Sequence, residues 1–360
     1  MLSNCELCDI FSFGGLTMWG DIAIAFLLAF ITAFMVTPYT IKLAKKVGAL
    51  DVPSADRKMH KEPMPRLGGL AVISGFFVSI IYLITIMTIE GSINIFASDL
   101  YKNLLGFLLG AIIIIITCFI DDIKSIHPIL KLLGQTLAAV CVVVSGTRIV
   151  NVDVLPINNT FSIILTIGWI IGITNAINLI DGLDGLSSGI TVISAVSLLI
   201  IFSLNQSPLI AIILITALAG SIIGFLPFNF NPAKTFIGDT GSNFLGFSLA
   251  VISILGVAKT YTAIVIIAPI IVLALPIFDT LFAIIRRLIT GKSIKAIVMP
   301  DRGHLHHRMM QMGLSQKQAV FILYGISAAF GMFAVILLDS GIWKALSFAL
   351  IVIAIVVFRV

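Results

Sequence analysis

The sequence predicts an all-α protein that crosses a membrane many times, and three observations support this fold class. Of the 360 residues, 59% are hydrophobic and only 11% are charged. The mean hydropathy of +1.16 is far above that of an ordinary soluble domain. Apolar runs of about 20 residues, enough helix to cross roughly 30 Å of hydrocarbon, recur along the whole chain. Since no polar stretch of domain size separates them, residues 1–360 are expected to form one transmembrane domain.

Eleven apolar segments are candidate membrane spans. Each is expected to be helical, because a helix satisfies its own backbone polar groups inside the bilayer. Pro269 and Pro276 stand in the ninth segment, which is therefore expected to kink and to open a groove for a lipid. The segments lie near residues 18–40, 67–89, 102–120, 129–145, 160–176, 186–203, 208–226, 241–258, 261–285, 318–338 and 342–359.

The basic residues predict the orientation of these spans. The connections that follow odd-numbered spans, together with the C-terminus, hold 18 of the 22 Lys and Arg, all except Lys102, Arg148, Lys259 and Lys344. Cytoplasmic loops carry an excess of Lys and Arg, so the N-terminus is predicted to be external and the C-terminus cytoplasmic. The net charge of +5 arises in these loops, and the expected partner is therefore a lipid bilayer and no nucleic acid.

The polar motifs of the chain all fall in the same odd-numbered connections, while the external connections hold no comparable cluster. This one-sided distribution favours an active site on the cytoplasmic face. A transporter with carboxylates inside the membrane is the rival from another functional class, but its ion-binding groups would lie near the bilayer midplane.

The fifth connection, Asn-Ala-Ile-Asn-Leu-Ile-Asp-Gly-Leu-Asp-Gly-Leu over residues 175–186, holds the densest motif. Asn175, Asn178, Asp181 and Asp184 follow one another at three-residue intervals between two apolar runs. Carboxylate and amide oxygens are hard ligands that suit Mg²⁺. The two glycines would each cost about 1 kcal/mol inside a helix, which predicts a broken helix here. The alternative is a simple cap between two spans.

Asp121 and Asp122 end the third apolar run, at or just inside the cytoplasmic boundary. An acidic side chain at membrane depth costs roughly 2.5–3.5 kcal/mol on insertion scales, and two adjacent ones repel each other. A divalent cation would compensate them, and Lys124 or Lys131 could help. The alternative is a solvated pair that merely ends a helix.

Residues 238–242, Gly-Asp-Thr-Gly-Ser, open the eighth span. Free backbone N–H groups at a helix N-terminus bind anions such as phosphate. Asp239 would repel a phosphate unless a cation lay between them, so the motif suggests a phosphate bridged by a metal. An ordinary helix N-cap is the alternative.

The ninth connection carries three histidines, His304, His306 and His307, close to Arg302. A zinc site lacks an evident fourth ligand and the spacing is not standard for one. Recognition of phosphate oxygens by His and Arg is preferred, with a solvated loop as the alternative. Lys58 and His60 of the first connection could add further donors.

Four of these motifs together resemble the polyprenyl-phosphate N-acetylhexosamine-1-phosphate transferases, the group that contains WecA, TagO and MraY. The matching stretches are Cys-Phe-Ile-Asp-Asp at 118–122, the motif at 175–186, Phe-Ile-Gly-Asp-Thr-Gly-Ser-Asn-Phe-Leu-Gly-Phe at 236–247 and Asp-Arg-Gly-His-Leu-His-His-Arg-Met at 301–309. They occur in the family's order and span nearly the whole chain. The resemblance implies transfer of a sugar phosphate from a UDP-sugar donor to undecaprenyl phosphate, with release of UMP and with Mg²⁺, or Mn²⁺ in its place, as cofactor.

The resemblance also implies roles for individual residues. Asp121 and Asp122 would be the catalytic carboxylates, and Asp239 with Asp122 would bind the metal. The substrate-binding set would be Lys58, His60, Lys131, Asn175, Asn178, Asp181, Asp184, Asn229, Arg302, His304, His306 and His307.

Two patterns are similar to the WecA/TagO branch and favour UDP-GlcNAc as donor. One is His-x-His-His at 304–307, and the other is the first-connection motif, Asp56-Arg57-Lys58-x-His60 with Pro63-x-Pro65 and Gly68-Gly69. The alternatives are a phospho-MurNAc-pentapeptide transferase of the MraY type and a lipid-linked glycosyltransferase that would release UDP. The expected location is the bacterial inner membrane, in the first membrane step of cell-envelope polymer synthesis. Direct in-line attack is favoured, with Asp121 or Asp122 positioning or deprotonating the acceptor, and a covalent aspartyl-phosphate intermediate is the alternative. Whether the protein forms a homodimer is left open.

Overall fold

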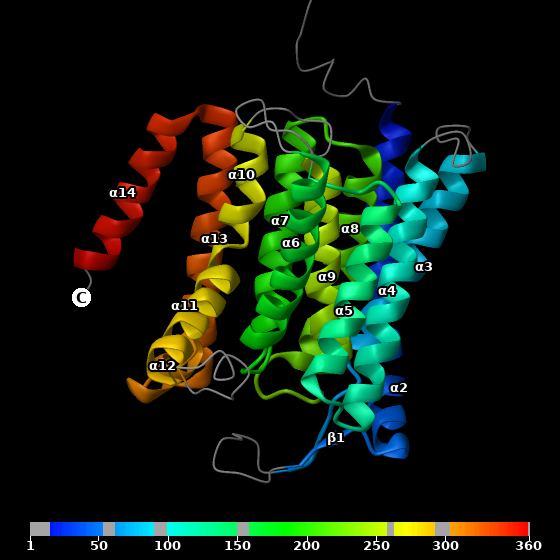
Figure 1. The fold of residues 1–360 in the computed structure, drawn as a ribbon, viewed down its shortest axis with the longest axis vertical. Helices are drawn as coiled ribbons and strands as arrows, with labels where there is room; N and C mark the ends of the chain where they lie inside the picture. Colours follow the sequence, from blue (N-terminus) through cyan, green and yellow to red (C-terminus); the bar gives the residue numbers. More distant parts are fainter. Residues whose placement is uncertain are drawn as a thin grey trace, which may run out of the picture.

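The computed structural model describes residues 15–52, 62–89, 99–149, 158–257, 263–291 and 303–358. Lys58, His60 and Arg302 lie outside these ranges. The described chain is a bundle of long helices joined by short connections (Figure 1). The all-α polytopic fold class is confirmed, with one ribbon of two very short strands as the only strands in the described ranges.

Eight helices in the described ranges are long and apolar enough to cross a membrane. The other three predicted spans correspond to α5, to the pair α10 and α11, and to α14, which are shorter or interrupted, so the total of eleven and the orientation stay predictions. The helix bounds are α2 (Gly15–Val47), α3 (Gly69–Ile89), α4 (Asp99–Ile123), α5 (Pro128–Val144), α6 (Asn159–Ile180), α7 (Leu186–Leu204), α8 (Leu209–Asn229), α9 (Gly238–Val257), α10 (Ala263–Val272), α11 (Ala274–Gly291), α12 (Leu305–Gln311), α13 (Gln316–Ser340) and α14 (Ile342–Phe358).

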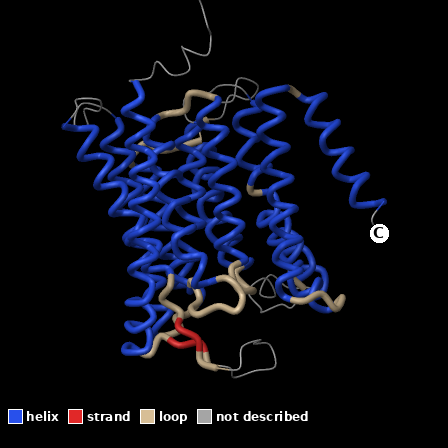
Figure 2. The backbone as a smooth tube through the Cα atoms, turned by 180° about the vertical axis from the view of Figure 1, so that it is seen from behind, coloured by secondary structure: helices blue, strands red, loops and turns tan. Residues whose placement is uncertain are grey.

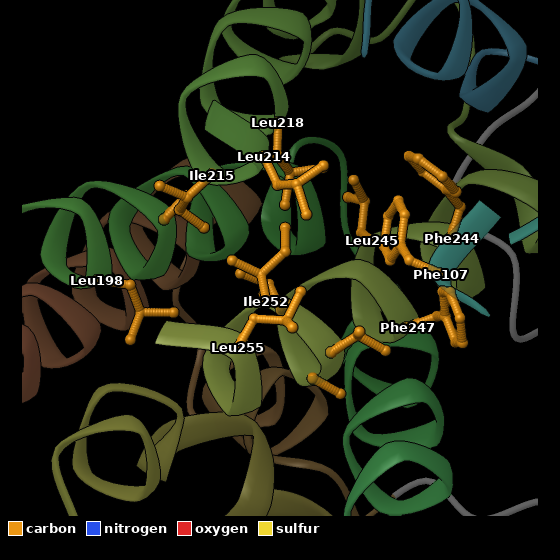
Figure 3. Packing of buried hydrophobic residues seen from close by; sticks show 14 of the residues in the cluster. Phe107, Leu198, Leu214, Ile215, Leu218, Phe244, Leu245, Phe247, Ile252 and Leu255 are labelled. Atoms are coloured by element: carbon orange, nitrogen blue, oxygen red, sulfur yellow. The ribbon is translucent and has the colours of Figure 1, made fainter. Parts of the chain in front are cut away.

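Helix α9 forms the centre of the bundle, with α8 beside it. In α9, 94% of the most apolar 18-residue stretch is buried, against 28% in α2 at the periphery. Phe244 and Phe247 of α9 pack with Phe107 of α4, and leucine and isoleucine side chains of α8 close the other side of this core (Figure 3). The helix that starts with the Gly-Asp-Thr-Gly-Ser motif is therefore held on all sides.

Small residues allow the central helices to approach one another. A Cβ atom on Gly246 of α9 would lie 2.7 Å from the Cα atom of Thr174 in α6, and one on Gly224 of α8 would lie 2.2 Å from the carbonyl oxygen of Phe30 in α2. Close backbone contact at small residues is the usual basis of helix packing in lipid, where apolar side chains gain little from leaving the solvent.

The kink predicted in the ninth span is confirmed. Helix α10 ends at Val272, Leu273 forms a turn, and α11 begins at Ala274 (Figure 1). Pro276 has no N–H to continue the hydrogen-bond ladder, which explains an interruption at this point.

The polar motifs gather at one end of the bundle, the lower end in Figure 1. The strands β1 (Leu50–Asp51) and β2 (Met64–Pro65) pair antiparallel there, with Leu50 opposite Pro65 (red in Figure 2). The predicted helix break is confirmed at the same end, because α6 ends at Ile180 and α7 begins at Leu186. The structure thus brings motifs from distant connections to one place.

Candidate active site

The segment between β2 and α3 runs beside the start of α9 and is hydrogen-bonded to it along the backbone. The N–H of Phe236 donates to the carbonyl of Pro65 over 2.8 Å. The N–H groups of Gly68 and Gly69 donate back, to Phe236 over 3.0 Å and to Ile237 over 2.8 Å. These bonds fix the position of Arg66 relative to the first turn of α9.

Gly238 is required at this contact. Its φ of +73° is one that side chains rarely allow, and a Cβ atom there would lie 1.9 Å from the carbonyl oxygen of Arg66. The glycine therefore permits both the turn into α9 and the close approach of the Arg66 segment.

Asp122 accepts hydrogen bonds at the N-terminus of α9. Its Oδ1 accepts from the N–H of Asp239 over 2.9 Å, and its Oδ2 accepts from the N–H and the hydroxyl of Thr240 over 2.9 and 2.6 Å. The side chain is fully buried. A carboxylate is favoured here because the helix N-terminus carries unsatisfied N–H donors and partial positive charge.

Asp239 itself points away from this cap and is held by cationic and amide donors. Arg66 Nη2 lies 2.9 Å from Oδ2, while Lys131 Nζ and Asn178 Nδ2 lie 2.6 and 2.8 Å from Oδ1. Four segments of the chain, the β2–α3 connection, α5, α6 and α9, thus meet at one carboxylate.

Asp121 faces a different neighbour from Asp122. Its Oδ1 accepts from the N–H of Ile126 over 2.9 Å, and its Oδ2 lies 3.2 Å from Lys131 Nζ. Successive helix residues point about 100° apart, so adjacent aspartates cannot serve one ligand in the same way. Neither residue is among those that line the cavity described next.

A cavity of about 530 Å³ opens beside Asp239. Its wall includes polar groups from several of the predicted motifs, namely Arg66, Asn178, Asp181, Asp184, Asn229, Asp239 and His307. A volume of this size is within the usual range for a small-molecule site. The position of the cavity supports the prediction that the motifs form a single site.

Asp181, at the end of α6, is a carboxylate with little compensation. Burial raises its pKa to about 7; the hydrogen bond from Ser187 over 2.6 Å opposes this effect, and the negative charge of Asp239 adds to it. A positive charge brought into the cavity would stabilise the ionised form of this group.

Asp184 and the connection after α8 build another part of the wall. Asp184 Oδ2 accepts from Asn231 Nδ2 over 2.8 Å and from the N–H of Ala233 over 3.2 Å. Asn229 accepts from Ser188 over 2.8 Å and donates to the carbonyl of Thr235 over 3.1 Å. Both predicted residues line the cavity while they also hold its wall in place.

The three histidines occupy three different environments. His304 is 5% exposed, and its Nδ1 lies 2.8 Å from Asp279 of α11, whose other oxygen accepts from the N–H of Leu305. His306 is 2% exposed, and burial, with neighbouring His307, lowers its pKa to about 3. Of the three, only His307 lines the cavity. His304 thus anchors α12, while His306 is neutral at pH 7.

His306 packs directly against the broken helix end. A Cβ atom on Gly182 would lie 2.2 Å from its Nε2, so the glycine leaves room for the ring. Both ring nitrogens are buried, and neither has a hydrogen-bond partner among the described residues. The fifth and ninth connections are thereby in contact through this pair.

Besides His304 and His306, two further residues predicted to bind substrate, Asn175 and Lys131, lie outside the cavity lining. Asn175 exchanges hydrogen bonds with Gln135 of α5 inside the bundle, over 2.7 and 3.3 Å. Lys131 contacts Asp239 from behind the cavity wall. Their positions suit a role in holding α5, α6 and α9 together.

The sequence reasoning missed three residues, Arg66, Asp279 and Asn231. Arg66 lies in the first-connection motif between Pro65 and Gly68 but was not assigned a role, although a basic residue close to two glycines was a signal. Asp279 is a lone acid in a predicted apolar span, and such a residue is costly unless it has a partner. Asn231 carried no signal of its own.

The oxygen donors fit Mg²⁺ of the kind bound with a substrate. In the described residues, no three His, Cys, Asp or Glu side chains are grouped to hold a metal ion alone. Mg²⁺ commonly uses one or two carboxylates together with waters and substrate phosphates. Asp239 and the undercompensated Asp181 both line the cavity and could provide such a pair.

Comparison with known proteins adds independent information. Residues 104–257 match the family described as glycosyl transferase family 4. The chain is 40% identical over 334 residues to the "Probable undecaprenyl-phosphate N-acetylglucosaminyl 1-phosphate transferase" of Bacillus subtilis (strain 168), covering 90% of this chain and 87% of that protein. It is 31% identical to the "Decaprenyl-phosphate N-acetylglucosaminephosphotransferase" of Mycolicibacterium smegmatis, covering 94% and 87%. It is 34% identical over 251 residues to the "Phospho-N-acetylmuramoyl-pentapeptide-transferase" of Listeria innocua, covering 65% of this chain and 73% of that protein.

Proposed function

The chain belongs to the polyprenyl-phosphate N-acetylhexosamine-1-phosphate transferase family, and from this premise we propose that it transfers GlcNAc-1-phosphate from UDP-GlcNAc to undecaprenyl phosphate, releasing UMP. The observation that carries the proposal is the 40% identity, over nine tenths of the chain, with a relative named for this reaction. The relative named for transfer of a muramoyl pentapeptide covers only 65% of the chain, which favours the smaller sugar donor.

The reaction needs charge neutralisation more than it needs a base. The second pKa of a phosphate monoester is about 6, so the acceptor is mostly a dianion at pH 7 and is already a nucleophile. One of its oxygens bonds to the β-phosphorus of the donor while the bond from that phosphorus to the UMP oxygen breaks. UMP leaves with the electron pair. The acceptor dianion must approach an anionic pyrophosphate, and Arg66 and His307 provide donors in the cavity that reduce this repulsion.

The candidate metal ligands are Asp239 and Asp181. Asp122 was expected to serve beside Asp239, but it accepts hydrogen bonds from α9 and does not line the cavity. Asp181 does line the cavity and is therefore the better candidate for the second carboxylate. When bound, Mg²⁺ would supply positive charge to the phosphate oxygens of the donor. In this arrangement Asp121 and Asp122 act as positioning residues: Asp122 holds the first turn of α9, and Asp121 holds Lys131.

The site is proposed to face the cytoplasm of a bacterial cell. The support is the excess of Lys and Arg in the connections at the same end of the bundle as the cavity. The carboxylates of the site also lie at that end of the bundle. An ion transporter would need them half-way along the helices, near the bilayer midplane.

The released nucleotide tests the proposed reaction. Purified protein in detergent, supplied with UDP-GlcNAc and undecaprenyl phosphate, is expected to release UMP in step with formation of a lipid-linked sugar pyrophosphate. Chromatography of the nucleotides measures this directly, with UDP-MurNAc-pentapeptide as the competing donor. Release of UDP, or turnover only with the pentapeptide donor, would refute the assignment.

The cofactor is tested separately. UMP release is expected to stop in excess chelator and to return on addition of Mg²⁺ or Mn²⁺, because two cavity carboxylates and a pyrophosphate cannot otherwise be brought together. The measurement is a titration of the rate against free Mg²⁺ in a metal buffer. A full rate at vanishing free metal would remove the cofactor from the proposal.

A further inference from the structure

We propose that Arg66 and Lys131 are internal counter-ions of Asp239 that would be displaced from this carboxylate when it binds a divalent cation. Arg66, which lines the cavity, then becomes available to the phosphates of the donor. The inference rests on the proposed function and deepens it, since it gives Arg66 a direct contact with the donor. It also explains why two basic side chains form ion pairs with a carboxylate that is expected to bind metal.

Both oxygens of Asp239 are occupied in the structure. Arg66 Nη2 lies 2.9 Å from Oδ2, and Lys131 Nζ lies 2.6 Å from Oδ1. Asn178 also donates to Oδ1, over 2.8 Å. A divalent cation that bonds either oxygen would stand within a few ångströms of a guanidinium or ammonium group, and like charges at that separation repel strongly. Metal binding at Asp239 therefore requires at least one of the two side chains to move.

The two cations have other anionic partners to which they can turn. Lys131 Nζ lies 3.2 Å from Asp121, and Arg66 Nη2 lies 3.6 Å from Asp122. Arg66 also lines the cavity, and its side chain is 28% exposed. A small movement about these alternative contacts is enough to release Asp239 while the basic groups stay at the site.

The backbone of Arg66 stays fixed during such an exchange. The carbonyl of Pro65 accepts two hydrogen bonds, from the N–H of Phe236 over 2.8 Å and from the hydroxyl group of Thr235 over 3.0 Å. The N–H of Gly68 donates to the carbonyl of Phe236 over 3.0 Å. Only the side chain is therefore free to change partner. Arginine suits the second partner, because its planar guanidinium pairs with two phosphate oxygens at once.

The exchange predicts that removing a counter-ion changes the affinities for the metal and for the donor in opposite directions. When a counter-ion competes with the metal, only the molecules whose carboxylate is free can bind it. The apparent Kd for the metal then equals the intrinsic Kd divided by the fraction of such molecules. Removing the counter-ion should therefore strengthen metal binding in the absence of donor. The same change should weaken donor binding, because a phosphate contact is lost. A residue with a purely structural role would weaken both.

The test measures Mn²⁺ binding to the purified, full-length protein without substrates, by electron paramagnetic resonance of the free ion. Arg66→Gln and Lys131→Gln are each expected to lower the Kd for Mn²⁺ about fivefold or more, within the usual range of coupling between two sites. Lys124→Gln is the matched control. Lys124 is exposed and lies two residues after Asp122, so this substitution removes a nearby positive charge that does not contact Asp239. Its Kd is expected to match the parent protein, as is that of Arg66→Lys.

The second measurement is binding of UDP-GlcNAc at saturating Mn²⁺, by calorimetry. Arg66→Gln is expected to weaken it about tenfold or more, as removal of a charge-assisted hydrogen bond does. Two results would overturn the exchange. One is unchanged or weaker Mn²⁺ binding in both glutamine variants, provided that they retain the parent's melting temperature. The other is unchanged donor binding in Arg66→Gln. If one variant fails to fold, the other decides. Failure of the parent protein to release UMP would instead refute the proposed function, and the Mn²⁺ result would stand independently.

Discussion

Asp239→Asn is expected to lower the rate of UMP release by at least about a hundredfold, the loss typical of removing one electrostatic contact to a transition state. The substitution keeps the shape of the side chain but removes the charge that a metal needs and that Arg66 and Lys131 neutralise. Arg66, which lines the cavity, and Lys131, which does not, would then have no carboxylate between them. We expect the Kd for Mn²⁺ to rise in parallel, measured on the same preparation.

A control separates this effect from a general effect of charge. Asp339→Asn changes an exposed acid near the end of α13, in contact with Ser340, and is expected to leave the rate and the Mn²⁺ affinity unchanged. If Asp239→Asn bound Mn²⁺ as tightly as the parent, Asp239 would not be a metal ligand and Asp181 would have to carry that role alone.

The fold was largely predictable because hydropathy acts locally. A run of about 20 apolar residues must form a helix in lipid, whatever its neighbours are. The break at residues 181–185 followed from two glycines, and the kink near Leu273 followed from two prolines. The sequence did not predict which helix lies at the centre of the bundle. Helix α9 is central because Gly241 and Gly246 allow contact with α3 and α6. Such contacts depend on helix surfaces that come from distant parts of the chain.

The candidate site was predictable in its location and less so in its details. Since connections on one side of a bundle must share one face, grouping the motifs required no knowledge of their contacts. Which carboxylate meets which donor depends on helix rotation, and adjacent positions differ by about 100°. Asp121 and Asp122 were treated as a pair, yet one faces Lys131 and the other caps α9. Asp279 was overlooked because its partner His304 lies 25 residues away.

The two aspartates therefore offer a test of how the site is built. A carboxylate that acts on the acceptor and one that holds a helix end both lose function when changed to asparagine, but they differ in what else changes. Loss of a contact made only in the transition state lowers kcat and leaves binding and stability intact. Loss of a buried cap disturbs everything that the cap positions.

Asp122→Asn is expected to behave as the loss of a cap. The asparagine keeps one acceptor oxygen but turns an NH₂ group toward either the N–H of Asp239 or the two donors of Thr240, which leaves buried donors unpaired at a cost of about 1–3 kcal/mol. We expect a lower melting temperature, weaker Mn²⁺ binding through the displaced Asp239, and a fall in UMP release of about a hundredfold.

Asp121→Asn provides the comparison, because it removes the same charge one residue earlier in α4. It loses a contact to Lys131 Nζ and a hydrogen bond from Ile126. Lys131 itself contacts Asp239, but Asp121 accepts no hydrogen bond from the backbone of α9 in the described residues. Its melting temperature and Mn²⁺ affinity should therefore stay closer to those of the parent. If Asp122→Asn instead kept the parent's stability, Mn²⁺ affinity and donor binding while losing only kcat, Asp122 would act on the acceptor directly, and the cap seen in the structure would have to open before the reaction.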